Sequence, residues 1–313
     1  MSSNSTPADI TIAAGGRPLV SIIIPSYNQG RFIRATLDSV LSQDYRPIEV
    51  LVMDGASKDE TVTILREYAA AHPELRWWSE PDKGVVDAVN KGLARASGPY
   101  AGIQSSDDIY LPGAISSAVG ALGAHSEVDI VYGDAYVMNE GGQLAPEYHR
   151  WAPYTLENLL CRATFIFQNS AFFRLDAARA VGGWRDRYFI ADLDLWLRMV
   201  MRRPAFKVDE VWSAWRIQPD QRNRQKALIW ESHWRMIEEN EDLRRAPLRL
   251  RLAARAGCRM FAEHYNPGSR WYQCYQLWLG LFTYPPSYRA LQNKTLLVPG
   301  LARMLGLFQS RRQ

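Results

Sequence analysis

Cysteine is scarce in this chain of 313 residues, with three widely separated copies at Cys161, Cys258 and Cys274. An odd number without C-x-x-C spacing argues against a disulfide framework or a zinc site, so we expect free thiols in a reducing compartment. The five histidines show no metal-ligand spacing either. The formal charge of +4 is small for this length, and we therefore expect no nucleic-acid partner.

Segments that would mark export or membrane insertion are also missing. The first residues contain no basic region followed by an apolar run, so we expect no signal peptide and predict a disordered lead-in over residues 1–17. The uncharged stretch 271–288 is interrupted by glutamines and by Pro285-Pro286. A transmembrane helix needs about 20 mostly apolar residues, so we expect no membrane span.

Glycine-rich phosphate loops are the next absence. The turn after the first predicted strand reads PSYNQG, which is not G-x-G-x-x-G, and no GxxxxGK[ST] sequence occurs anywhere in the chain. These absences argue against a Rossmann dinucleotide site and a P-loop nucleotide site.

The N-terminal half instead alternates short apolar runs with amphipathic segments. The apolar runs predict strands at 19–24, 48–53, 75–78 and 100–104, and the segments between them predict helices at 31–43, 62–69 and 85–96. Strands that alternate with helices at this spacing indicate βαβ units and a mainly parallel sheet.

Acidic residues follow several of these strands, at Asp54, Asp82, Asp107 and Asp108. Ligands of open α/β sheets bind outside the carboxyl ends of the strands, where a carboxylate can accept hydrogen bonds from a uracil N–H or a ribose hydroxyl. Two adjacent carboxylates also favour a divalent cation that carries diphosphate oxygens. The alternative for each acid is ordinary turn or capping chemistry, and Asp107-Asp108 would then cap a helix that starts at Ile109.

Four motifs in one order carry a resemblance over about residues 20–218: SIIIPSYNQGRFIRATLDSVLSQDY, EVLVMDGASKDET, SEPDKGVVDAVNKG and SSDD. Together they resemble the inverting family 2 glycosyltransferases of the GT-A fold, and more narrowly the bacterial enzymes that build surface polysaccharides. The resemblance implies an α/β domain over residues 18–222, with a mixed, mainly parallel central sheet flanked by helices. A helical region rich in aromatic and basic residues would follow over residues 223–313.

The resemblance also implies roles for matching residues. The base and ribose pocket would be lined by Pro25, Tyr27, Asp54 and Asp82. Asp108 matches the last aspartate of the family's DxD motif and would bind Mn²⁺ or Mg²⁺. Asp107 is the middle position, near the ribose or phosphate, and Ser106 stands where many members carry the first aspartate.

A later segment, ADLDLWLR, resembles the family's segment that contains the catalytic base, with Ala191 in place of the usual glutamate. Asp192 would be that base, at the N-terminus of a helix whose dipole favours its ionised form. Further contacts to the diphosphate or the acceptor are expected from Lys83, Gln168, Arg216 and Gln218. Many relatives have histidine at the position of Gln218, and an amide is a poor metal ligand.

The implied activity is the transfer of one hexosyl or N-acetylhexosaminyl group from a nucleotide-diphosphate sugar, with a UDP-sugar preferred, to a glycan or polyprenyl-linked acceptor. Two alternatives are a nucleotidyltransferase, whose GxGTR-like loop is absent here, and an inactive sugar-nucleotide-binding partner, which Ser106, Ala191 and Gln218 favour. We expect a cytoplasmic protein whose C-terminal region, including the amphipathic stretch 296–308, contacts the inner face of the membrane or packs as helical core.

Overall fold

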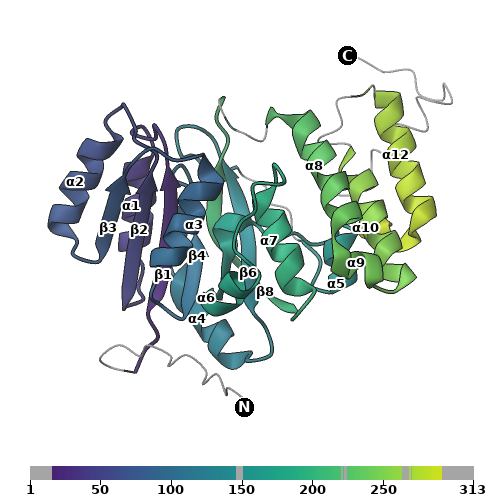
Figure 1. Cartoon of the computed structure of the whole chain (residues 1–313), viewed down its shortest axis with the longest axis horizontal. Coiled ribbons are helices and arrows are strands. Elements are labelled where there is room, and N and C mark those ends of the chain that lie inside the picture. The colour runs from purple at the N-terminus through teal and green to yellow at the C-terminus, as the bar shows by residue number, and fades with distance from the viewer. Residues whose placement is uncertain are drawn as a thin grey trace, which may run out of the picture. The chain divides into compact units, whose positions relative to one another are not determined.

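The computed structural model describes residues 16–145, 151–219, 221, 224–262, 268 and 270–290. These residues form two compact units, which we treat separately (Figure 1). Unit 1 contains the described residues up to 145 together with 166–186 and 191–218. Unit 2 contains 151–165, 187–190 and the described residues from 219 onward. Two short segments from the middle of the chain therefore belong with the C-terminal helices.

Unit 1 is built on one eight-stranded sheet in the order β3-β2-β1-β4-β7-β6-β8-β5. The first four strands along this order are parallel, β7 is antiparallel to both neighbours, β6 and β8 are parallel, and β5 is antiparallel to β8. This is the mixed, mainly parallel sheet that the sequence predicts. The strands are β1 Val20–Ser26, β2 Ile48–Asp54, β3 Leu75–Ser79, β4 Tyr100–Ile103, β5 Ile109–Tyr110, β6 Ile130–Met138, β7 Ala171–Arg174 and β8 Ala205–Arg216.

Helices cover both faces of this sheet. One face holds α1 (Ile33–Leu41), α2 (Thr61–Ala71) and α4 (Ala114–Ala124), whose apolar side chains form one buried cluster with alternate residues of the strands. The opposite face holds α3 (Val85–Arg95), α6 (Leu175–Ala180) and α7 (Ala191–Val200). Gly92 of α3 lies so close to the sheet that a Cβ there would be 2.3 Å from a methyl group of Ile23. Only glycine allows this approach.

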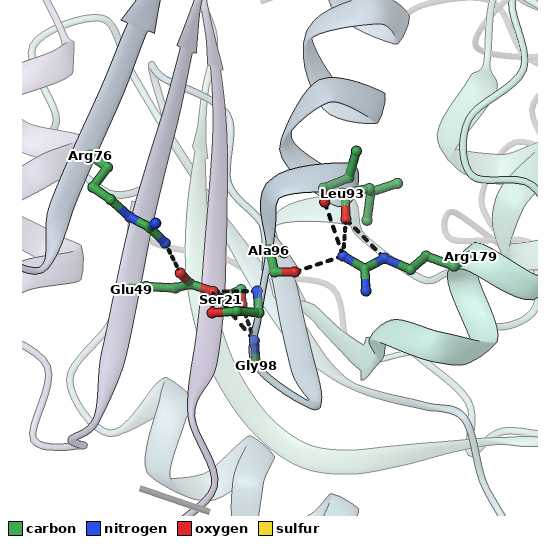
Figure 2. Close-up of polar contacts among 9 residues, drawn as sticks. Ser21, Glu49, Arg76, Leu93, Ala96, Gly98 and Arg179 are labelled. Atoms are coloured by element: carbon green, nitrogen blue, oxygen red, sulfur yellow. Dashed lines mark hydrogen bonds and ion pairs between the residues drawn. The ribbon is translucent and has the colours of Figure 1, made fainter. Parts of the chain in front are cut away.

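A buried carboxylate joins the amino ends of three strands, at the edge opposite the predicted site (Figure 2). Glu49, near the start of β2, accepts hydrogen bonds from Ser21 Oγ at 2.6 Å and from the Ser97 N–H at 2.6 Å, and it pairs with Arg76. Burial opposes the ionisation of Glu49, but these hydrogen bonds and the charge of Arg76 outweigh it and lower its pKa. Since Ser97 lies in the turn three residues before the start of β4, Glu49 fixes the entry of β4 into the sheet.

The C-terminus of α3 is held by a second cation, also drawn in Figure 2. The Arg179 guanidinium donates to the carbonyl oxygens of Leu93 and Ala96, each at 2.6 Å from Nη2. These carbonyls belong to the last turn of the helix, where they have no partner within the helix and where a positive charge is favoured. Arg179 therefore ties α6 to α3.

Unit 2 is helical: α5 (Leu156–Leu160), α8 (Lys226–Glu239), α9 (Glu241–Arg245), α10 (Leu248–Met260), α12 (Arg270–Thr283) and the 3-10 helix η3 (Pro285–Ala290). Its core contains a buried cation, Arg162, whose Nη2 lies 2.6 Å from His233 Nε2 and whose guanidinium lies 4.3 Å from the ring centre of Phe261. No described helix is long and apolar enough to cross a membrane.

The apolar run from Phe165 to Phe173 does not form one strand, because a 3-10 turn, η1 (Gln168–Ser170), directs polar side chains inward before β7 starts. Asp134 lies inside β6, which continues to Met138. Most of the lead-in 1–17, and all of the stretch 296–308, lie outside the described residues.

Candidate active site

The turns that follow β1 and β2 are joined by hydrogen bonds. The Asn28 N–H donates to Ser57 Oγ and the Lys58 N–H donates to Asn28 Oδ1, both at 2.8 Å, while the Gly30 N–H donates to Asp59 Oδ2 at 2.9 Å. Asn28 has a left-handed backbone with φ of 51°. Asparagine tolerates this conformation better than most residues, which lets its side chain reach the second turn.

Asp54, the last residue of β2, is buried at the base of these turns. Its Oδ2 accepts from the Ser57 N–H at 3.0 Å and from Ser79 Oγ at 2.6 Å, and its Oδ1 accepts from Ser57 Oγ at 2.5 Å. Asp54 therefore makes the contact with Ser57 that ordinary turn chemistry, the alternative to ligand binding, predicts for it. A carboxylate has about four acceptor positions, so the serines leave one position on Oδ1.

The other residues expected in the base and ribose pocket lie around Asp54. Pro25 pairs in register with Met53, one residue before the strand end, and Tyr27 in the next turn is 59% exposed. Asp82 follows β3, and its Oδ2 would be 2.8 Å from a Cβ placed on Gly55. Asp82 Oδ1 also accepts from the Gly84 N–H at 2.8 Å, an Asx turn, and the neighbouring Lys83 is exposed.

Asp107 and Asp108 follow β4, at the carboxyl edge that also carries Asp54. No helix starts at Ile109, since Ile109 begins β5 and pairs with β8, so the interpretation of this acid pair as a helix cap is wrong. Asp108 is buried, and its Oδ1 accepts from the Arg216 N–H at 2.8 Å while its Oδ2 accepts from Asn169 Nδ2 at 3.2 Å. Asp107 is half-buried and accepts from Gln218 Nε2 at 2.6 Å.

The two carboxylates share a poorly solvated position. Burial, and then the charge of Asp107, raise the pKa of Asp108 well above its usual value. Burial also raises the pKa of Asp107, against the hydrogen bond from Gln218 and the charge of Arg216. The pair therefore favours a cation that can bring positive charge to both side chains.

Residues from distant parts of the chain converge on this pair. Arg216, at the end of β8, donates through Nε to the Asp107 carbonyl at 2.8 Å and through Nη1 to the Glu140 carbonyl at 2.7 Å. Gln168 Nε2 lies 3.3 Å from Ser105 Oγ, just before the acids. The structure thus brings Gln168, Arg216 and Gln218 to the acid pair, while a contact of these residues or Lys83 with a diphosphate stays a prediction.

Asp192 is the second residue of α7, in the first turn, as the sequence predicts. Of the ten residues of α7 it is the one that is not buried. Inside the helix, Asp194 and Arg198 form a buried ion pair at 2.7 Å, and Arg198 also donates to the carbonyls of Val181 and Gly183. The helix is thus anchored on its inner side and leaves Asp192 accessible.

The loop before α7 is fixed from α3 as well. Asn90 donates through Nδ2 to the Trp184 carbonyl at 2.8 Å and accepts from the Trp184 N–H at 2.9 Å. The Asn90 side chain therefore connects α3, the helix after Asp82, to the segment that leads towards Asp192. The sequence alone does not indicate a role for Asn90, Ser57 or Asn169. Of the three, only Asn169 carried a signal, as a polar residue within the apolar run FIFQNSAFF.

The acid pair fits a hard divalent cation. Mg²⁺ and Mn²⁺ prefer oxygen ligands, and Mg²⁺ is commonly held by one or two carboxylates together with substrate phosphates. Within the described residues no group of three or more histidine, cysteine or acidic side chains gathers into a complete protein metal site. Two carboxylates with the remaining positions filled by a diphosphate and water match this donor set.

Comparison with known proteins gives a consistent result. The family model described as Glycosyl transferase family 2 matches residues 21–182. The chain is 27% identical to chondroitin synthase of Escherichia coli over 225 residues, which cover 71% of this chain and 32% of that protein. It is 31% identical to a PGL/p-HBAD biosynthesis glycosyltransferase of Mycobacterium bovis over 185 residues, which cover 58% of this chain and 69% of the relative. The chain thus spans about a third of the chondroitin synthase.

Two solved structures share the fold. S. aureus TarS residues 1–349 in complex with UDP-GlcNAc matches with a TM-score of 0.63 and 14% identity, over 93% of each chain. The mannosyltransferase PcManGT from Pyrobaculum calidifontis, in complex with GDP-Man and Mn²⁺, also has a TM-score of 0.63, with 20% identity over 97% of this chain and 85% of that chain. The sheet and its flanking helices thus form the GT-A fold implied by the sequence.

Proposed function

Because the chain belongs to glycosyl transferase family 2, we propose that it transfers one sugar from a nucleotide-diphosphate donor to a hydroxyl of a glycan or polyprenyl-linked acceptor, with inversion at the anomeric carbon. The observation that carries this proposal is the acid pair of half-buried Asp107 and buried Asp108, held at the carboxyl edge of the sheet. The relatives named as a chondroitin synthase and a PGL/p-HBAD biosynthesis glycosyltransferase support the same class of reaction.

The chemistry needs a base, and we assign that role to Asp192. Its carboxylate would take the proton of the acceptor hydroxyl while that oxygen attacks the anomeric carbon. The bond from this carbon to the diphosphate breaks, and its electron pair leaves with the diphosphate. A bound Mn²⁺ or Mg²⁺, held by Asp108 with Asp107 beside it, would neutralise the charge on the departing group. A carboxylate is a weak base at neutral pH, so positioning supplies much of the rate.

Uridine is the base that we expect, and the hydrogen bonds of Asp54 support it. Ser57 and Ser79 already fill three of about four acceptor positions on this carboxylate. The remaining position suits a base that presents one N–H, as uracil does at N3. Guanine presents an N–H and an amino group side by side and would need both oxygens. Pro25, Tyr27 and Asp82 would complete the pocket for base and ribose.

The test combines nucleotide binding with turnover. In calorimetric titrations we expect UDP binding to require Mn²⁺ or Mg²⁺. The Asp108→Ala variant should lose this metal-dependent binding of UDP. Asp192→Asn should keep donor binding and lose at least about 100-fold in transfer rate, because a positioned base contributes about that much. Asp176→Asn is the matched control, since Asp176 also lies in the first turn of a helix but is exposed.

Each outcome has a separate meaning. Metal-independent UDP binding that survives Asp108→Ala would remove Asp108 from its role. GDP binding as tight as UDP binding would contradict the uridine assignment and leave the transfer reaction standing. Donor binding without any turnover, across the acceptors tried, would favour the inactive sugar-nucleotide-binding partner instead.

A further inference from the structure

Charge is divided unevenly along this chain. Residues 243–313 contain eleven arginines and one lysine against a single acidic residue, Glu263, which gives a net charge of +11. Since the whole chain carries +4, residues 1–242 carry −7. The small total charge therefore conceals a strongly basic C-terminal region attached to an acidic catalytic unit, and such a region attracts anionic surfaces.

In α10, Arg251 and Arg255 lie on the outer side of the helix. Leu248, Arg251 and Arg255 are exposed and follow one another at helical spacing, with Leu248 at 63% exposure. Residues on the opposite side are small and buried, and a Cβ at Gly257 would be 2.0 Å from the Leu160 carbonyl. Within the described part of the chain, neither Arg251 nor Arg255 has an ion-pair partner. These two charges remain available to a ligand.

The neighbouring helix, α12, exposes aromatic side chains instead. Tyr272, Tyr275 and Phe282 are 45%, 56% and 77% exposed, and α12 contains no acidic residue. The two helices pack against each other, because Arg259 Nη1 donates to Gln276 Oε1 at 2.9 Å and Gly280 fits against Met260. The solvent-facing sides of this helical pair thus carry arginine, leucine and aromatic residues.

We propose that the exposed sides of α10 and α12 form a docking surface for an anionic lipid bilayer. Arginines near such a surface are attracted by anionic headgroups, and tyrosine and phenylalanine insert at the boundary with the acyl chains. A soluble polyanion such as an acidic glycan would use the charges but would gain little from a Phe282 side chain that is 77% exposed. The combination therefore favours a membrane.

This surface deepens the proposed function, since it would hold the enzyme where polyprenyl-linked acceptors are embedded. It rests on residues of unit 2, and none of the residues assigned to donor binding belongs to it. Failure of the membrane proposal and failure of the transfer proposal can therefore be measured separately, on the same purified full-length protein.

The experiment is co-sedimentation with vesicles of phosphatidylcholine alone and of phosphatidylcholine with phosphatidylglycerol. We expect binding to the anionic vesicles only, weakening as salt is raised, and at least about tenfold weaker binding for Arg251→Glu/Arg255→Glu. Arg66→Glu/Arg202→Glu is the matched control, because it makes the same change in net charge at exposed arginines of unit 1. Tyr275→Ser/Phe282→Ser should remove the part of the binding that resists salt.

Three results would overturn the proposal. One is that the wild type binds both kinds of vesicle equally well, or binds neither kind. Another is unchanged binding of Arg251→Glu/Arg255→Glu alongside a loss on deletion of residues 291–313, which would assign docking to that segment. The third is competition by a soluble acidic polysaccharide that displaces the protein from vesicles at low concentration. Circular dichroism and urea unfolding, measured on every variant, check that each protein is folded without relying on nucleotide binding.

Discussion

At the residue scale, Asp108 is held by groups that lie far from it in the sequence. One carboxylate oxygen accepts from the backbone of Arg216 and the other from Asn169, while the Thr36 hydroxyl donates to the Asp108 carbonyl at 2.7 Å. A carboxylate that is to bind a metal must point in one direction, and hydrogen-bonded neighbours commonly fix such an orientation. Asn169 contributes such a restraint directly through its side-chain amide.

Replacement of Asn169 by alanine should therefore weaken the metal-dependent binding of UDP. Loss of one hydrogen bond to a charged group corresponds to roughly 1.5–3 kcal/mol, so we expect roughly a 10- to 150-fold increase in the apparent dissociation constant for Mn²⁺ at fixed UDP. Asn139→Ala is the control, because Asn139 is exposed and its contact with Arg216 is made by its backbone carbonyl. Equal Mn²⁺ affinities for the two variants would show that Asn169 does not orient Asp108.

At the element scale, the two edges of the sheet have different tasks. The carboxyl edge carries the polar groups to which we assign ligand binding, whereas the amino edge is closed by Glu49, Ser21 and the turn before β4. The amide contact of Asn90 with Trp184 and the anchor of Arg198 below α7 then connect the second half of the site to the first. The positions of the functional loops thus depend on contacts made between the elements.

Glu49→Gln should destabilise unit 1 by about 1–3 kcal/mol at pH 7, because a buried, hydrogen-bonded carboxylate loses its charge and two backbone N–H groups lose a strong acceptor. The folded state lowers the pKa of Glu49 below its ordinary value of 4.5. Its stabilising effect is therefore complete above that value and disappears as the pH falls through the folded pKa. In urea unfolding, the difference in the free energy of unfolding between wild type and Glu49→Gln should become smaller below pH 4.5.

The matched control for this prediction is Glu67→Gln on the surface. Glu67 pairs with Arg34 at 2.7 Å, but both side chains are about half exposed, at 53% and 50%. Exposed pairs contribute little, so we expect a change within roughly 0.5 kcal/mol. A Glu49 variant no less stable than the Glu67 variant would mean that the amino-edge network does not hold the sheet together.

At the scale of the whole molecule, the two units have different chemistry. Unit 1 has the acidic site on a mixed sheet, and unit 2 is a group of helices with a buried arginine at its centre. Next to that arginine, burial and then the charge of Arg162 lower the pKa of His233 well below 6.5. His233 is thus neutral in the folded state, where its Nε2 can accept from Arg162.

The free energy of unfolding should therefore fall as the pH is lowered, because His233 is protonated only in the unfolded chain. The unfolded chain takes up a proton at this histidine below pH 6.5, while the folded chain does not, so unfolding becomes easier by about 1 kcal/mol between pH 6.5 and 5.5. His233→Gln should remove this part of the slope in urea unfolding followed by circular dichroism. His72→Gln is the control, since His72 stacks on Tyr68 at the end of α2, outside unit 2. Identical slopes in wild type and His233→Gln would contradict the assignment.

The sequence by itself determined the parallel half of the sheet, because the period of apolar residues and the turn residues that follow them are local properties. It also identified the acids after β2, β3 and β4 and the position of Asp192 in the first turn of α7, through motifs that lie within short stretches of chain. Asp107-Asp108 illustrates the limit, since the dipeptide alone is also compatible with a helix cap.

Only the tertiary structure decided what surrounds these residues. Asn169 and Arg216 reach Asp108 across 61 and 108 positions of sequence, and Ser57 and Asn28 meet across 29. Such contacts depend on the order in which strands enter the sheet, and no local pattern encodes that order. The same holds for the membership of residues 151–165 in the C-terminal unit and for the side of α10 that stays exposed, because burial is a property of what packs against a helix.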